Sequence, residues 1–213
     1  MVWRIPAFVL ASILLWQAAS WFAESRRTAA LAGYVHAAWW ERGESVGPET
    51  LLASPPARPD GRAWSAYAQA LVASARNTPD LAVRRQYLER ADEAARRALR
   101  LSPAQAATWA RLALIAVNRG NNSLAAAALS RSLVLAPRAS RLAWPRAKVG
   151  LYLWEQLDGE GQAAIAADLG RVWRQPPGAE LPYPRQAVMR YAASLGVERL
   201  VTALIRKEED GAG

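Results

Sequence analysis

The chain begins with an apolar run and continues as amphipathic segments separated by short polar breaks. Residues 5–23 (IPAFVLASILLWQAASWFA) contain no charged side chain. As a helix, this run is about 28 Å long, close to the hydrocarbon thickness of a bilayer. After residue 61 the apolar positions recur with helical spacing, and no run of Val, Ile and Thr indicates a strand. The pattern predicts an all-α protein with an N-terminal transmembrane helix.

Tryptophans lie near both ends of the predicted span and toward the end of a predicted helix over residues 28–42. We expect them at the membrane interface, where aromatic belts lie: Trp3, Trp21, Trp39 and Trp40. A cleaved signal peptide is the alternative, because Arg4 and the small residues 18–20 give a weak version of its charged start and exit. The bulky Trp16 near that exit and the length of the run favour an uncleaved anchor.

Two features of the sequence bear on the orientation of the anchor, and they favour opposite sides of the membrane. One arginine precedes the span and two follow it, which favours a cytoplasmic carboxyl side. A short amino tail followed by one span and a long domain is the usual layout of an exported domain. We favour export, with a single pass through a bacterial inner membrane and the domain on the periplasmic side.

Local signals predict the helix limits in the rest of the chain. A Pro-rich linker over 43–61 precedes helices at 62–76, 80–101, 104–119, 124–135, about 140–157 and 162–174, a loop at 176–184, two short helices around Gly196 and a frayed tail over 208–213. Asp80 and Ser123 are the expected N-caps, and Gly120 is the expected left-handed stop. Gly159 and Gly161 are expected to separate two helices.

The chain contains an internal repeat. The shift along the sequence that places Leu99 on Leu133 also places Leu101 on Leu135 and Pro103 on Pro137. A repeat of helix pairs with this period is typical of a solenoid, in which each pair buries its apolar face on the next.

The repeat resembles the tetratricopeptide repeat (TPR) superfamily over residues 62–157. The signature positions of the best unit, 106–139, are Trp109, Leu112, Ala113, Ala125, Leu129 and Pro137. A preceding unit fits from Trp64 with 11 extra residues between its helices, and a degenerate unit begins at Trp144, with Pro145 inside or at the start of its helix. The resemblance implies an α-solenoid of antiparallel helix pairs; the alternative is an unrelated bundle rich in alanine.

Four parts follow from these observations. They are a transmembrane anchor (1–27), a juxtamembrane helix with the Pro-rich linker (28–61), TPR-like repeats (62–157), and C-terminal helices with the tail (158–213).

The positive charge of the chain lies in one segment. Residues 1–93 carry 10 basic and 9 acidic side chains, residues 155–213 carry 7 and 9, and residues 94–154 carry 10 and none, giving the net charge of +9. An acid-free face attracts carboxylates and phosphates. The expected anion- or partner-binding residues are Arg96, Arg97, Arg100, Arg111, Arg131, Arg138, Arg141, Arg146 and Lys148. The alternative is that these side chains cover helix flanks with their stems and keep their charges in water.

Composition excludes much chemistry. The chain has no cysteine and one histidine, His36, which excludes disulfides, CxxC redox pairs, zinc fingers and multi-histidine metal sites. Phosphate-loop motifs are absent from the sequence. We therefore expect no catalysis, no metal and no cofactor.

The expected function is that of a membrane-anchored helical-repeat scaffold with protein partners. Its layout, and its stretch from Trp154 to Trp173, resemble accessory proteins of bacterial envelope polysaccharide biosynthesis and export. The same layout occurs in cytochrome c maturation, pilus-assembly and translocon-associated factors. The other alternative is an anion-binding module for an acidic glycan or a lipid phosphate. The absence of a recognition motif argues against nucleic acid.

Overall fold

The computed structural model of the protein describes residues 55–56, 60–175 and 184–210. Within these ranges the chain is helical and has no strand, which confirms the all-α prediction for this part of the chain. The helices are α3 (Gly61–Asn77), α4 (Leu81–Leu101), α5 (Ala106–Asn118), α6 (Asn122–Leu135), α7 (Ser140–Tyr152), the 3₁₀-helix η1 (Trp154–Gln156), α8 (Gly159–Trp173), α9 (Pro184–Leu195) and α10 (Glu198–Asp210).

Several predictions concern residues outside the described ranges. These are the membrane span 5–23, the helix 28–42, most of the linker, the loop 176–183, and the side chains of Trp3, Trp21, His36, Trp39 and Trp40. Among the helices that the structure describes, none combines the length and the apolar character needed to cross a bilayer.

Side-chain caps set the starts of α3, α4, α6 and α8. Asp80 accepts hydrogen bonds from the amides of Ala82 and Val83 and caps α4, as predicted. Gly120 has a φ of 73° after α5, which confirms the left-handed stop. The prediction for Ser123 is wrong, because the preceding Asn121 already accepts from the amide of Leu124 and caps α6.

Two further limits near the C-terminal end differ from the prediction. Gly159 and Gly161 lie in the first turn of α8 and do not separate helices, because Asp158 accepts from the amide of Gly161 and starts the helix there. The tail predicted to fray from residue 208 stays helical to Asp210. A carboxylate oxygen of Glu208 lies 3.9 Å from Nη2 of Arg174, directly after α8, which ties the end of α10 to the rest of the protein.

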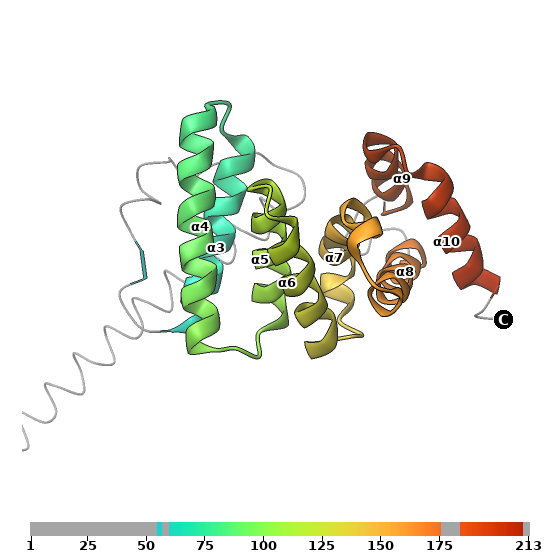
Figure 1. Ribbon diagram of the computed structural model, residues 1–213, viewed down its shortest axis with the longest axis horizontal. Helices are drawn as coiled ribbons and strands as arrows, with labels where there is room; N and C mark the ends of the chain where they lie inside the picture. Colours follow the sequence, from blue (N-terminus) through green and yellow to red (C-terminus); the bar gives the residue numbers. More distant parts are fainter. Residues whose placement is uncertain (1–54, 57–59, 176–183, 211–213) are drawn as a thin grey trace, which may run out of the picture.

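The helices pack as antiparallel hairpins in chain order. α3 packs on α4, α5 on α6, and α7 on α8, and each hairpin contacts the next, as Figure 1 shows. α9 and α10 pack against α8 at the far end. The predicted boundary at residue 157 falls between the two helices of the third hairpin.

The spacing of the elements repeats between hairpins. α5 begins at Ala106 and α7 at Ser140, which are separated by the same shift that relates Leu99 to Leu133 in the sequence. The turns within the first two hairpins have three residues each (78–80 and 119–121), and the turns between hairpins have four each (102–105 and 136–139).

The 11 extra residues of the first unit are entirely helical. α3 has 17 residues against 13 in α5, and α4 has 21 against 14 in α6. The differences of 4 and 7 are about one and two turns at about 3.6 residues per turn. Whole turns keep the same side of each helix toward its neighbour, so the first hairpin extends beyond the second without losing its packing (Figure 1).

The two turns that join the first three hairpins, 102–105 and 136–139, lie at one end of the stack, which we call the basal end; the other is the tip end. The Ser132 hydroxyl near the end of α6 donates to the carbonyl of Ala106 at the start of α5 (2.8 Å). Arg171 near the end of α8 donates to the carbonyl of Pro137 in the turn before α7 (2.9 Å). The start of α3 at Gly61 lies against Ser102 in the turn before α5. The helical stack therefore also begins at the basal end.

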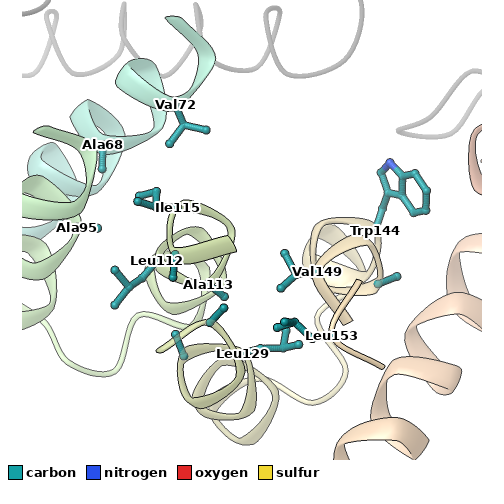
Figure 2. Packing of buried hydrophobic residues seen from close by; sticks show 14 of the residues in the cluster. Ala68, Val72, Ala95, Leu112, Ala113, Ile115, Leu129, Trp144, Val149 and Leu153 are labelled. Carbon is teal, nitrogen blue, oxygen red and sulfur yellow. The ribbon is translucent and has the colours of Figure 1, made fainter. Parts of the chain in front are cut away.

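Small side chains form much of the core. Ala68 and Ala95 pack with Leu112 between the first two hairpins, and Leu129 faces Val149 and Leu153 between the second and third (Figure 2). Close helix packing follows from these small contact residues.

The six residues of the repeat signature differ in how deeply they are buried. Leu112, Ala113, Ala125 and Leu129 are buried. Trp109 is partly buried and donates to the carbonyl of Pro103 (2.8 Å), and Pro137 is exposed in the turn after α6.

α7 and α8 approach each other closely at Gly150. A Cβ atom placed on Gly150 would lie 2.4 Å from Cγ1 of Ile165, which is fully buried. Gly159, at the start of α8, has nothing within 4 Å of the same position. One glycine is therefore required by packing and the other is not.

We expect Gly150→Ala to lower the free energy of unfolding by about 1–3 kcal/mol, because the added methyl overpacks the contact with Ile165. Gly159→Ala should leave stability unchanged or raise it by up to about 1 kcal/mol, because alanine favours helix. Urea denaturation followed by circular dichroism measures both. Ile165→Val should partly rescue Gly150→Ala; equal stability of the two alanine variants would contradict this account.

Candidate binding surface

The structure separates the nine predicted anion-binding residues into three groups. Some lie inside the protein, one is on the surface but paired with a carboxylate, and the others are exposed. The acid-free segment of the sequence is therefore not an acid-free face of the folded chain, because Asp92 and Asp168 lie outside the segment and fold against it.

Arg146 lies in the interior and is fully buried. Its Nε and Nη2 donate to the two carboxylate oxygens of Asp168 in α8 (2.7 and 3.0 Å), and Nη1 donates to the carbonyl of Ala136 after α6 (2.8 Å). Arg171 donates to the same carboxylate. The prediction that Arg146 lies on an anion-binding face is wrong, because its charge is neutralised inside the stack.

Asp92 neutralises two more arginines. This mostly buried carboxylate of α4 lies 2.7 Å from Nε of Arg96, one turn later in the same helix. It also lies 3.2 Å from Nη1 of Arg119, which follows α5. The pair with Arg119 joins the first hairpin to the second.

Arg111 takes part in a polar network between α3 and α5. Its guanidinium donates to the hydroxyl of Ser65 and to the side-chain oxygen of Gln69. The Ser65 hydroxyl also lies 2.6 Å from that of Thr108. Burial lowers the pKa of Arg111 to about 10. Arg111 thus links two hairpins and does not present its charge on an open surface.

Lys148 lies in a largely buried aromatic setting. Its Nζ is 5.5 Å from the centre of the Trp144 ring, and its carbonyl accepts from the hydroxyl of Tyr191 in α9 (3.1 Å). Burial and the nearby Arg76 lower the pKa of Lys148 from 10.5 to about 8.

The remaining arginines are exposed. Arg97 stacks over the Trp64 ring at 4.3 Å, so its head group also serves packing. The other four lie in or near the last turn of α4, the second half of α6, the turn after it and the start of α7, all toward the basal end. We call these residues the basal edge: Arg100, Arg131, Arg138 and Arg141.

The sequence analysis did not identify Asp92, Asp168 and Arg146 as buried or mostly buried ion-pair residues, although the pattern of apolar positions around two of them indicated burial. Arg146 lies in an apolar stripe with Ala143, Ala147 and Gly150, at helical spacing along one face. Asp168 interrupts a similar stripe of α8. A charged residue in such a stripe indicates a buried partner of opposite charge.

Neither the described side chains nor comparison with known proteins indicates another ligand-binding or metal site. In residues 60–175 and 184–210, no group of three His, Asp or Glu side chains is placed to hold a metal ion. Comparison of the chain with protein-family models, curated proteins and solved structures finds no match.

We expect Asp168→Ala to cost about 3–5 kcal/mol of unfolding free energy, because it leaves the Arg146 guanidinium buried without its carboxylate. Replacing both charges with apolar residues, Arg146→Met with Asp168→Leu, should cost less than the single change. Chemical denaturation measures both, and Glu155→Ala, at an exposed position, is the matched control with an expected change below about 0.5 kcal/mol. A loss as small as that of the control would contradict this role.

The pKa of Lys148 predicts a pH-dependent stability. Because this pKa is lower in the folded chain than in the unfolded one, the unfolded chain binds more protons between pH 8 and 10.5, and stability rises with pH across that window. Lys148→Met should stabilise the protein at pH 7 by an amount on the order of 2 kcal/mol. This advantage should shrink toward the upper end of the window, measured by denaturation at each pH. The other lysine supplies the control: Lys207→Met, at an exposed position, should show no such trend, and equal trends would refute the assignment.

Proposed function

We propose that the protein is a non-catalytic scaffold, a TPR-like α-solenoid that a transmembrane helix over residues 5–23 holds at a bacterial inner membrane. The observation that supports it best is the repetition of the hairpins: α5 and α7 begin one repeat period apart, and both turns between hairpins have four residues. In such a stack each hairpin buries its apolar face on the next. The result is an extended surface suited to holding protein partners.

The use of the polar side chains supports a scaffold. Asp92, Asp168 and Arg146, which could have carried chemistry, are engaged in joining one helix or hairpin to another. Arg111 is engaged in the same way between α3 and α5. These groups stabilise the arrangement of the hairpins, which is what a scaffold requires of its interior.

The biological setting that we favour is an envelope assembly system, most of all polysaccharide biosynthesis or export, with the helical domain on the periplasmic side. Cytochrome c maturation, pilus assembly and translocon-associated adaptation are the alternatives. All of them require the same physical arrangement, an anchored helical repeat that keeps a protein partner near the membrane.

An anion-binding module is a second candidate function, and the exposed basal edge is the observation that favours it. Its ligand would be an acidic glycan or a lipid phosphate. Arg146 is excluded from this site by its burial, so a test of anion binding must leave it intact.

For the scaffold, we expect the full chain to resist alkaline extraction from membranes and a chain without residues 1–27 to be released. Purified in mild detergent, the full chain should retain a membrane-protein partner. Asp168→Ala should lose this partner together with its fold, and Gly159→Ala should keep it. Recovery of no membrane partner with the wild-type chain and Gly159→Ala would overturn the scaffold, as would catalytic turnover that depends on His36.

A further inference from the structure

We propose that the stack docks an acidic segment of its own chain, residues 41–49, on the side formed by the first helices of the three hairpins, α3, α5 and α7. The contact is electrostatic and places Glu41, Glu44 and Glu49 against basic side chains of those helices. It does not depend on the proposed membrane anchor. It adds to the proposed scaffold a surface that the chain itself covers.

The first helices of the hairpins contain basic side chains and no carboxylate. The basic residues of α3, α5 and α7 are Arg62, Arg76, Arg111, Arg141, Arg146 and Lys148. α9, which contacts α7, adds two arginines and again no Asp or Glu. The carboxylates within the hairpin helices lie in α4 and α8. Because α3 contacts α5 and α5 contacts α7, the first helices form one continuous side of the stack.

Polar side chains recur along this side. Each first helix carries a pair of them seven residues apart, which is about two turns and therefore the same side of the helix. We call these residues the first-helix stripe: Gln69 and Arg76 in α3, Arg111 and Asn118 in α5, and Arg141 and Lys148 in α7.

The first-helix stripe continues from one helix to the next. Arg111 of α5 donates to the side-chain oxygen of Gln69 in α3, so these two positions face each other. Burial and the nearby charge of Arg76 both lower the pKa of Lys148, so α3 and α7 bring their cations close together across α5. An anionic group placed between Arg76 and Lys148 would relieve their repulsion.

Carboxylates in the turns next to these helices are engaged elsewhere. Asp60, Asp80 and Asp158 accept from backbone amides at the starts of α3, α4 and α8. In residues 60–175 and 184–210, no carboxylate forms an ion pair with Arg76, which is exposed near the end of α3. The turns therefore do not supply the anion that this side of the stack attracts.

The occupant that we favour comes from the chain itself. Arg141 and Lys148 each interact with a further group of the chain, so neither is waiting for an added protein. Pro56 precedes α3 outside any helix and is buried, so the chain that leads into α3 also lies against the stack. A segment that precedes Pro56 is therefore close to the first-helix stripe by connection alone.

Residues 41–49 have the matching charge and length. The 54 residues before the described ranges contain four glutamates, and three of them lie in this segment with one arginine, Arg42. Gly43, Gly47 and Pro48 disfavour a helix there and favour an extended chain. Nine extended residues span about 30 Å. Three packed helices span about 20 Å between their outer axes, so one segment can cross α3, α5 and α7.

An acidic partner of the proposed scaffold would have to displace this segment to reach the same side chains. The segment would thus decide which partners gain access to the first helices. An acidic segment of another protein and residues 41–49 of a second copy are the competing occupants.

The test uses the absence of cysteine, which makes introduced cysteines unique sites for spin labels. Ser45→Cys labels the acidic segment without removing a glutamate, and Asn118→Cys labels the first-helix stripe. In the matched pair, Ser130→Cys replaces Asn118→Cys and puts the second label on the exposed side of α6. The full chain is purified in mild detergent, and double electron–electron resonance measures the distance between the labels.

We expect a narrow distribution of distances between positions 45 and 118, shorter than that between 45 and 130 by about the 10 Å that separates packed helices. Replacing Glu41, Glu44 and Glu49 with Gln should broaden the distribution and remove the difference. Salt at about 0.5 M should act in the same direction. The Gln variant changes no residue of the described stack, so its helix content by circular dichroism should equal that of the wild type.

Charge reversal supplies a second measurement. Arg76→Glu with Arg141→Glu should broaden the distribution, and the further changes Glu41→Arg and Glu49→Arg should narrow it again. The matched control reverses two exposed arginines of α4, Arg85→Glu and Arg90→Glu, and should leave the distribution narrow. If the reversed stack loses its helix content, the Gln variant of the acidic segment still decides.

Equal distances from position 45 to both labels, or an unchanged distribution in the Gln variant, overturn the inference. A dipolar signal between two singly labelled chains mixed together would assign the contact to a second copy. A broad distribution in a chain that binds polyglutamate through Arg76 and Arg141 would assign the first-helix stripe to an acidic protein. Alkaline extraction tests the anchor without reference to these distances, so either proposal can fail alone.

Discussion

The buried guanidinium of Arg146 holds the two helices of the third hairpin together through Asp168 and holds that hairpin to the second through the carbonyl of Ala136. Arg146 belongs to α7. The fixed plane of its N–H donors reaches the Asp168 carboxylate of α8 and the Ala136 carbonyl after α6, so one guanidinium joins three elements. A buried charge with this geometry tolerates little movement of its partners. α9 and α10 pack on α8, so their position in the stack depends on that fixed arrangement.

The distribution of charge follows from the same contact and from the one at Asp92. A net charge of +9 gives no information about which arginines are exposed. In the folded chain, Asp92 and Asp168 bind four arginines, while Arg100, Arg131, Arg138 and Arg141 lie exposed toward the basal end. A scaffold gains from this division, because the charges that fix its shape are separate from those that can contact a surface.

Local chemistry made most helix limits predictable, and tertiary contacts did not follow from it. The cap at Asp80, the stop at Gly120 and the repeat period each depend on neighbouring residues or on spacing along the chain, so the sequence alone reveals them. Asn121 and Ser123 lie two positions apart and are both suitable N-caps for α6, so spacing along the chain did not show which of them caps the helix. The pairing of Arg146 with Asp168 joins two helices through packing, and only the apolar stripes around them indicated burial. Of the nine basic residues predicted to form one surface, only four therefore lie on the basal edge.

The extra length of the first hairpin has a consequence for how such a protein can vary. Because its 11 additional residues amount to whole helical turns added at the tip, they change the height of the hairpin and leave its contacts near the base as they are. The height of the first hairpin above the basal end can thus change without a change in its contacts at that end. Insertions of other lengths would rotate the added surface away from its partner helix, so the height of the stack can change only in steps of one turn.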